Sequence, residues 1–227
     1  MRAIFVEGLP GTGKTTTAQA IQRWCGSRQM AASWWLEEDP NHPATPKTLR
    51  RTASAPGFAE RCLSHWARFV SQKRMSSEIL ILEGSAFQST IRFMLESGMA
   101  RAEILQYVRR FESVVAPLDP RLVYLEPVDA RTFLSEFVYK MRGPEWTAKV
   151  SNYLASTPCC RDRGWSGPEG MLEFWLLYQN LCEEALAGLG FPVLCLRTGP
   201  GRWMHAQMEL ASWLARSALS VGPAKAC

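Results

Sequence analysis

The sequence predicts an α/β fold of three layers, in which a five-stranded parallel sheet is flanked by helices. Three observations lead to this prediction. Short apolar runs alternate with longer segments whose apolar residues recur every three or four positions, which is the pattern of strand–helix–strand units. The run at 79–82 is apolar at every position, as expected for a parallel strand buried on both faces. A glycine-rich stretch at 8–16 joins the first apolar run to the first helical pattern.

The strands and helices can be placed in order along the chain. The expected strands are 2–6, 31–36, 79–82, 121–125 and 192–196. The expected helices are 17–25, 57–74, 104–115, 134–141, 171–189 and 201–218. Residues 41–56 contain three prolines and are expected to form an ordered loop. Residues 140–165 lack helical periodicity and gather glycine, proline and charge, so they are expected to be an insert.

The length and composition indicate one domain. The chain has 227 residues, of which 47% are hydrophobic and 21% are charged, so it can bury a sizeable core. We expect a single domain at 1–221 with a lid insert at about 140–165. We expect a frayed tail at 222–227.

The composition also argues against several classes of protein. The chain has 26 Lys and Arg against 21 Asp and Glu, and this net charge of +5 suits phosphate ligands but is too small to indicate nucleic acid. No apolar stretch approaches the length of a membrane span, and the first residues do not form a secretory signal. Seven cysteines without a CxxC pair argue against a disulfide framework or a zinc site. We therefore expect a cytoplasmic protein with neither a membrane nor a nucleic-acid partner.

Residues 8–15 carry the strongest motif of the sequence. They match G-x-x-x-x-G-K-[ST] at every fixed position, between an apolar run and a helical pattern. In such a P-loop the backbone N–H groups surround a phosphate, and the helix N-terminus adds favourable partial charge. Lys14 is expected to reach the β- and γ-phosphates, and the Thr15 hydroxyl is expected to bind Mg²⁺. The motif therefore predicts the P-loop NTPase fold with ATP as ligand. The expected ATP-binding residues in the loop are Gly8, Pro10, Gly11, Thr12, Gly13, Lys14, Thr15 and Thr16.

Motifs of other P-loop classes are missing from the sequence. No N-K-x-D segment and no D-x-x-G switch follows the loop, which argues against a GTPase. An LSGGQ-type signature and an Asp-Glu Walker-B run, as in oligomeric ATPases, are also missing. Together with the short chain, this pattern favours a small phosphotransferase.

The chain resembles the P-loop kinases of the nucleoside and nucleotide kinase superfamily, with thymidylate kinases and deoxynucleoside kinases nearest. The resemblance rests on GLPGTGKTT near the N-terminus, LEEDP at the second strand and ILILEGS at the third. It implies that Lys14 contacts phosphate and Thr15 binds Mg²⁺. It also implies that the loop after the fifth strand, which contains Arg197, Thr198 and Gly199, lies against the adenine.

The same resemblance implies roles for acidic residues. Deoxynucleoside kinases place a Glu at the end of the second strand as general base toward the substrate hydroxyl, and Glu37, Glu38 or Asp39 stands there. After the third strand they carry E-R-S, where this chain has Glu83-Gly84-Ser85. Glu83 is implied to hold Mg²⁺ through water. The arginine of that motif is missing, and so is the D-R-x motif of thymidylate kinases.

Residues 37–39, the acidic stretch, place three negative charges at the carboxyl end of an expected strand. Ligands bind at that edge of an open α/β sheet, and a carboxylate there can deprotonate or orient a hydroxyl. The same charges would repel a phosphorylated acceptor. They favour a nucleoside, an amine-bearing alcohol or an antibiotic-like molecule. The alternative is a solvated acidic loop, and for Glu83 it is a helix cap.

The insert at 140–165 is basic. Five Lys and Arg against two Asp and Glu give this segment a net charge of +3. A mobile arginine can neutralise charge on a transferring phosphoryl group, and a closing lid excludes water. Arg142, Arg161 and Arg163 are the candidates for this role. The alternative is a solvated basic loop.

These features favour an ATP- and Mg²⁺-dependent kinase that transfers the γ-phosphate to a hydroxyl of a neutral or cationic small molecule. The expected metal ligands are Thr15 and Glu83. Two alternatives stay open: a nucleoside monophosphate kinase, and a nucleotide-binding regulatory module without kinase turnover. The expected catalytic residues are Lys14, Glu37, Glu38, Asp39, Glu83, Arg142, Arg161 and Arg163.

Overall fold

The computed structural model describes residues 1–54, 56–199 and 201–219. Its centre is a five-stranded parallel sheet with the strand order β2-β3-β1-β4-β5. This is the α/β fold that the sequence predicts. Pro200 and the expected tail at 222–227 lie outside the described residues. The strands are β1 (Ala3–Gly8), β2 (Ala32–Trp35), β3 (Ile79–Glu83), β4 (Pro120–Pro127) and β5 (Val193–Thr198).

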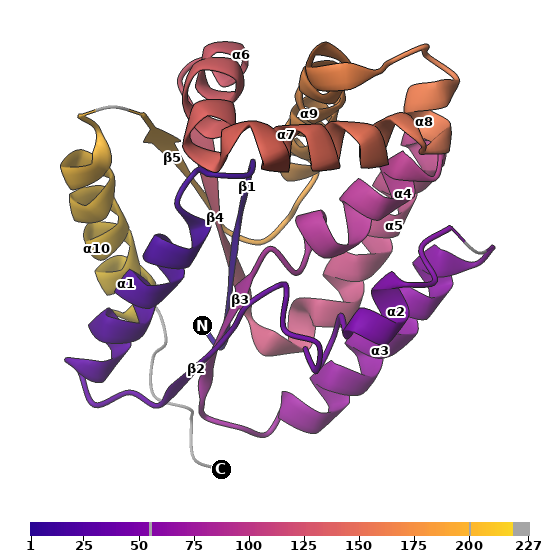
Figure 1. Cartoon of the computed structure of the whole chain (residues 1–227). Helices are drawn as coiled ribbons and strands as arrows, with labels where there is room; N and C mark the ends of the chain where they lie inside the picture. Colours follow the sequence, from indigo (N-terminus) through magenta and orange to yellow (C-terminus); the bar gives the residue numbers. More distant parts are fainter. Residues whose placement is uncertain (55, 200, 220–227) are drawn as a thin grey trace.

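Two helical layers cover the sheet because successive side chains of a strand point to opposite faces. In β1, Ile4 and Val6 share an apolar core with α1 (Lys14–Gly26) and α10 (Trp203–Leu219). Ala3 and Phe5 belong to the core on the other face. Figure 1 shows α1 and α10 on one side of the sheet and α3 and α5 on the other. The helices of this second core include α3 (Phe58–Lys73), α5 (Arg101–Val115) and α9 (Gly167–Ala187).

The segment after β3 is helical and is absent from the helices expected above. It forms a π-helical turn, η1 (Phe87–Ile91), followed by α4 (Arg92–Glu96). Its buried apolar residues Phe87, Ile91, Met94 and Leu95 do recur at helical spacing, and the polar residues Ser89, Thr90 and Glu96 are buried among them. The carboxylate of Glu7 in β1 accepts hydrogen bonds from the backbone at the start of η1.

The insert at 140–165 is also mostly helical. After α6 (Ala130–Thr132) and η3 (Phe133–Val138), the chain forms α7 (Tyr139–Ala155) and α8 (Pro158–Arg161). Gly143 breaks the helical pattern of α7 with a φ of 80°, and Pro144 follows it. This kink explains why the sequence lacks periodicity where the structure has helix. In Figure 1, α7 crosses above the carboxyl ends of the strands, next to α9.

Two further short elements complete the described fold. α2 (Lys47–Arg50) lies inside the proline-containing loop, and η2 (Ala116–Leu118) leads into β4. The cysteines within the described residues are free thiols, and all of them except Cys195 are buried. Among these residues, the structure contains no helix whose length and apolarity would let it cross a membrane.

Candidate active site

The P-loop connects β1 to α1 at the carboxyl edge of the sheet. Gly13, with a φ of 95°, stands directly before Lys14, the first residue of α1. The Lys14 ammonium donates to the carbonyl oxygens of Gly8 and Leu9, each at 3.1 Å. This folds the lysine back across the loop, and the open N-terminus of α1 directs partial positive charge to the same place. The segment can therefore bind the phosphates of a nucleotide.

Thr15 and Glu83 lie together beside the P-loop. The Thr15 hydroxyl donates to Glu83 Oε1 at 2.6 Å, and the indole of Trp34 donates to Glu83 Oε2 at 3.1 Å. Glu83 is buried at the end of β3, and burial raises its pKa, while the bonds from Thr15 and Trp34 and the charge of Lys14 oppose this.

The Thr15–Glu83 pair fits a magnesium ion bound mainly by substrate phosphates. Mg²⁺ prefers oxygen ligands, keeps several waters and uses only one or two protein groups in such sites. A hydroxyl and a carboxylate in hydrogen-bond contact next to the phosphate loop supply those groups. Within the described residues, no three His, Cys, Asp or Glu side chains gather into a protein-only metal cage.

Glu37 follows β2 and points at the turn after β3. The Gln88 amide donates to Glu37 Oε1 at 2.5 Å, while the other oxygen, Oε2, is shielded and receives no hydrogen bond from the residues that the structure describes. Burial raises the pKa of Glu37 to about 7. Glu38 and Glu83 act in the same direction, and the charges of Lys14 and Arg92 oppose them. A carboxylate with such a pKa is suited to accept a proton near neutral pH.

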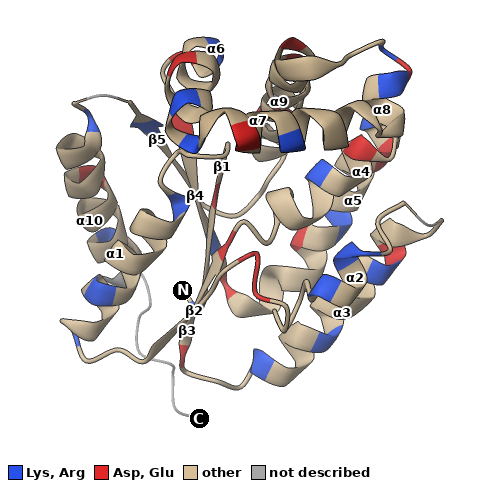
Figure 2. Ribbon diagram, viewed as in Figure 1, with Lys and Arg blue, Asp and Glu red and all other residues tan. Residues whose placement is uncertain are grey.

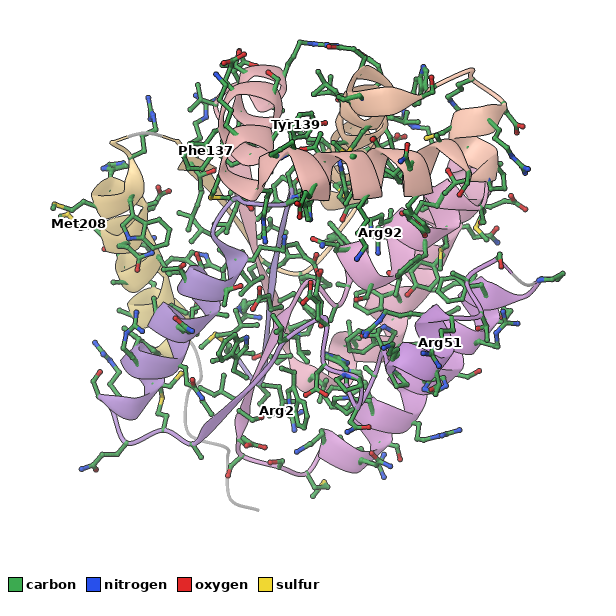
Figure 3. The ribbon with its side chains drawn as sticks, in the orientation of Figure 1. Arg2, Arg51, Arg92, Phe137, Tyr139 and Met208 are labelled. Carbon is green, nitrogen blue, oxygen red and sulfur yellow. The ribbon has the colours of Figure 1, made fainter. Side chains whose placement is uncertain are left out.

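Arg92 places a positive charge near Glu37, and the sequence analysis did not include this arginine among the site residues. Its guanidinium pairs with Glu96 at 2.5 Å and donates to the Gln88 carbonyl at 3.2 Å. The Tyr153 hydroxyl of α7 donates to the other Glu96 oxygen at 2.7 Å. Arg92 thus supplies a cation beside Glu37, where the chain lacks the arginine of the E-R-S motif, and Glu96 balances its charge. Figure 3 shows Arg92 beneath α7.

Glu7 fixes the segment that carries Gln88 and Arg92. Its fully buried carboxylate accepts the backbone N–H groups of Ala86, Phe87 and Gln88 at 2.7, 3.1 and 3.3 Å. Burial raises its pKa to about 8, against the effect of these bonds. Because Glu7 immediately precedes the P-loop, it ties the start of η1 to the strand that leads into the loop.

One cavity of about 590 Å³, which we call the main cavity, is lined by Lys14, Thr15, Glu37, Glu83, Gln88 and Arg92 together with the residues given below. Figure 2 shows the acidic stretch after β2 as a red loop beside the central strands, below α7. Of the residues that the sequence predicts, the lining contains Pro10, Gly11, Gly13, Lys14, Thr15, Thr16, Glu37, Glu38, Glu83 and Arg142. The sequence argument missed Leu36, Gln88, Arg92, Met141, Trp146, Val150, Tyr153 and Trp175.

A second cavity of about 340 Å³, the aromatic slot, lies on the other side of the P-loop. The rings of Phe133 and Phe137 stack in it at 5.5 Å. In Figure 3, Phe137 lies toward α10 and Arg92 lies on the opposite side, toward α4. A flat apolar slot next to the phosphate loop suits the base of a nucleotide. Its lining residues are Gly11, Thr12, Gly13, Thr16, Phe133, Phe137, Thr198, Gly199 and Trp203.

Five predicted site residues lie outside both linings. Gly8 is one of them, and its carbonyl oxygen accepts from Lys14. Asp39 accepts the N–H of Asn41 at 2.8 Å and so forms a turn. Arg197 is exposed on β5, and Arg161 is exposed on α8. Arg163 donates to the carbonyl oxygen of Cys159 at 2.9 Å. Of the three candidate lid arginines, the structure brings only Arg142 to the main cavity, with its guanidinium 5.8 Å from the Trp146 ring.

A sequence signal for the missed acceptor residues does exist. Gln88, Arg92 and Glu96 recur every fourth position directly after the apolar run ILIL and Glu83. Such spacing places side chains on one face of a helix, and a helix that starts at the carboxyl end of a strand faces the ligand edge. Tyr153 has no such signal, because its contact with Glu96 joins residues 57 positions apart.

Comparisons with known proteins find similarity among solved structures. No protein-family model and no curated protein matches the chain. The crystal structure of YorR protein from Bacillus subtilis, in complex with phosphorylated GDP, matches at a TM-score of 0.52 and 13% identity, over 96% of this chain and 95% of that chain. The structure of deoxyadenosine kinase from M. mycoides with bound dATP matches at a TM-score of 0.46 and 16% identity, over 96% of this chain and 99% of that chain. The first match shows that the chain shares the fold of the YorR structure, a parallel α/β sheet flanked by helices.

Proposed function

We propose that this protein is an ATP- and Mg²⁺-dependent phosphotransferase that moves the γ-phosphoryl group to a hydroxyl of a neutral or cationic small molecule. One observation carries the proposal: the P-loop lysine, the Thr15–Glu83 pair and the Glu37 carboxylate line the same cavity. Phosphoryl transfer needs these groups together, because catalysis depends on positioning and on charge stabilisation. The partner of this reaction is a small molecule and not a nucleic acid or a membrane.

The donor nucleotide occupies the P-loop in this proposal. The aromatic slot takes the base, Lys14 and the loop N–H groups bind the β- and γ-phosphates, and Arg142 approaches from α7. Thr15 and Glu83 would hold Mg²⁺, which when bound would offset the negative charge of the phosphates. The nucleotides bound in the YorR structure are consistent with such a donor or product site.

The acceptor hydroxyl lies against Glu37. Its proton passes to the Glu37 carboxylate, whose Oε1 accepts from Gln88. The hydroxyl oxygen forms a bond to the γ-phosphorus as the bond from that phosphorus to the bridging oxygen breaks, and ADP leaves. Gln88 keeps the Glu37 carboxylate in one orientation, which reduces the reorganisation that the transfer requires.

The rest of the main cavity supports a nucleoside-like acceptor within this class. Trp146, Tyr153 and Trp175 offer rings against which a planar group can stack. Arg92 and Glu96 form a neutral pair, so Glu37 and Glu38 keep the acceptor end negative. A hydroxylated antibiotic or another metabolite with a planar or amine-bearing group has the same chemistry.

A nucleoside monophosphate acceptor is the second candidate. Arg92 and Arg142 both line the main cavity, and two arginines are the usual means of holding a phosphate. Against it stands the short Arg92–Glu96 contact, which already occupies one of these cations.

An ATP-consumption screen tests the proposal. The wild-type protein, with Mg²⁺ and ATP, is offered nucleosides, nucleoside monophosphates and hydroxylated antibiotics, and the phosphorylated product is identified by mass. We expect little ATP hydrolysis alone and much faster consumption with one acceptor class. Lys14→Ala should lose this turnover while remaining folded, because the ammonium binds ligand and contributes little to the core. Acceptor-independent ATP hydrolysis at the full rate, or binding without product, would contradict the proposal.

A further inference from the structure

His42 is the only fully buried histidine in the described part of the chain, and both ring nitrogens are engaged. Nδ1 lies 3.2 Å from the backbone nitrogen of Ala44 and 2.9 Å from that of Thr45. A backbone N–H can only donate, so Nδ1 accepts both bonds and carries no proton. The proton of the neutral ring must then sit on Nε2. Burial lowers the pKa of His42 to about 4, which is consistent with a neutral ring.

The second nitrogen reaches a different part of the fold. Nε2 lies 2.9 Å from the Ser85 hydroxyl, which itself donates to the Glu83 carbonyl at 2.9 Å. The single hydroxyl hydrogen of Ser85 is used in that bond, so Ser85 accepts from His42 Nε2–H. A directional chain of two hydrogen bonds therefore runs from the ring of His42, through Ser85, to the backbone of Glu83.

These two hydrogen bonds connect the two segments that carry Glu37 and Glu83 into the main cavity. His42 belongs to the loop that starts at Glu37, and Ser85 belongs to the turn that starts at Glu83. Arg50 also holds the loop, through the carbonyls of Glu37 and Thr45, but it lies on α2 and does not reach the β3 turn. His42 thus provides a second side-chain bond between the loop and the segment after β3, in addition to the bond from Gln88 to Glu37.

We propose that His42 is a positioning residue that sets the separation between Glu37 and the Thr15–Glu83 pair. The inference rests on the proposed function, since it assigns Glu37 to the acceptor and Glu83 to the metal. The required separation is narrow, because the turn and the Glu37 carboxylate are in close contact at Gly84. A loop released from Ser85 can shift, and an error of about 1 Å in the placement of a reacting group costs on the order of 10²-fold in rate.

Two substitutions of His42 separate its local bonds from its bond to Ser85. In His42→Asn, the amide oxygen can replace Nδ1 as acceptor for Ala44 and Thr45, but the side chain is too short to reach Ser85. In His42→Gln, the amide nitrogen can reach Ser85 and donate to it. Ser85→Ala removes the same bond from the other side. Ser113→Ala is the matched control, because it also removes a hydroxyl that donates to a backbone carbonyl, at an exposed position of α5.

We expect His42→Asn and Ser85→Ala to lower kcat by about 10-fold to 10²-fold, with an unchanged KM for ATP. His42→Gln should recover part of this loss, and Ser113→Ala should behave as wild type. The double variant His42→Asn/Ser85→Ala should be no slower than Ser85→Ala, since both substitutions remove the His42–Ser85 bond and Ser85→Ala alone also removes the bond to the Glu83 carbonyl. Losses that multiply in the double variant, or a normal kcat with only a lower Tm, would overturn the proposal.

A measurement that does not depend on activity tests the role of His42 separately from the proposed phosphotransferase function. Imidazole ¹⁵N NMR of the wild-type protein without ligand should show Nε2 protonated and Nδ1 bare. In Ser85→Ala, the pKa of Glu37, followed by carboxyl ¹³C NMR, should move from its wild-type value. A ring protonated on Nδ1, or a Glu37 pKa that stays fixed in Ser85→Ala, would refute the positioning role. A wild-type protein with the expected NMR behaviour and no turnover on any acceptor would refute only the proposed function.

Discussion

The carboxylate of Glu37 fills the space that a side chain at position 84 would need. A Cβ on Gly84 would lie 1.9 Å from Glu37 Oε2, and Gly84 itself has a φ of 60°, in the left-handed region. This contact gives a physical reason for the missing arginine after Glu83. An E-R-S sequence would force Glu37 out of its present position, and the cation of the acceptor side comes instead from Arg92, one helix further along.

Gly84→Ala should therefore lower kcat by about 10²-fold or more, because the new methyl group displaces the proposed general base. ATP binding should change by no more than about twofold, since the new methyl group collides with Glu37 and not with a residue of the P-loop. Steady-state kinetics and nucleotide titration measure the two effects.

Gly164→Ala is the matched control for this substitution. Gly164 has a φ of 67°, close to that of Gly84, but a Cβ there meets nothing within 4 Å. Both variants carry the strain of a left-handed alanine, and only one collides with Glu37. Equal losses of kcat in the two variants would attribute the effect to backbone strain and not to Glu37.

The pH dependence of the reaction should report Glu37. Its pKa is raised to about 7 by burial, with Glu38 and Glu83 in the same direction and Lys14 and Arg92 in the opposite one. A protonated carboxylate accepts no proton, so kcat/KM for the acceptor should fall about tenfold per pH unit below 7 and level off above it. Glu37→Gln should be slow and lack this inflection. A wild-type profile that is flat from pH 5.5 to 8 would exclude Glu37 as the base.

The same pKa shift predicts a change in stability with a definite sign. Between about 4.5 and 7, the folded state binds the Glu37 proton and the unfolded state does not. The free energy of unfolding must then decrease as the pH rises through this window. Glu37→Gln removes the contribution, so the Tm of the wild type should fall relative to this variant from pH 4.5 to 7.5. A constant difference in Tm would mean that the pKa of Glu37 is not raised in the folded protein.

The lid arginines should differ in their effect on catalysis. Arg142 lines the main cavity, whereas Arg161 and Arg163 lie outside it on and after α8. Arg142→Ala should lower kcat by about 10²-fold, in the range for lost charge stabilisation in the transition state. Arg161→Ala and Arg163→Ala should stay within about twofold of wild type, and they serve as controls for the loss of a surface charge. A large loss in either of them would require α8 to close over the cavity during turnover.

The sequence predicts the fold and half of the site because those features are local. The P-loop is a contiguous motif, and Glu37, Glu38 and Glu83 end apolar strands that must meet at one edge of the sheet. Arg142 lies in the segment 140–165, whose net positive charge can be counted from the sequence. For these residues, neighbours in the sequence are sufficient to indicate their place.

The remaining features depend on contacts between distant segments. Arg92 follows a π-helical turn, and its place in the main cavity depends on the contacts of this segment with β1 and α7. Its charge is balanced by Glu96, which Tyr153 reaches from 57 positions away. The bond from His42 to Ser85 spans 43 positions. Side-chain pairings of this kind follow from tertiary packing and leave no regular spacing in the sequence.

The charge of the acceptor end yields the last prediction. Arg92 lies in the main cavity, but its guanidinium is 2.5 Å from Glu96, and the two charges offset each other. Lys14 is on the donor side, so Glu37 and Glu38 leave the acceptor end negative. A nucleoside monophosphate brings up to about two negative charges. Two like charges about 4 Å apart cost about 4 kcal/mol at an effective dielectric constant of about 20. Neutral or cationic hydroxyl compounds should therefore exceed nucleoside monophosphates in kcat/KM by about 10²-fold or more.

Glu96→Gln tests whether this charge balance sets the preference. The variant keeps an acceptor for the Tyr153 hydroxyl and a similar volume, but it leaves the charge of Arg92 unbalanced. The ratio of kcat/KM for a nucleoside to that for its monophosphate should fall by about tenfold or more, with ATP binding unchanged. Glu60→Gln removes the partner of Arg110 in an exposed ion pair and should leave the ratio as it is. Efficient conversion of a nucleoside monophosphate to its diphosphate by the wild type would overturn the preference. An unchanged ratio in Glu96→Gln would show that the pairing of Arg92 with Glu96 does not determine it.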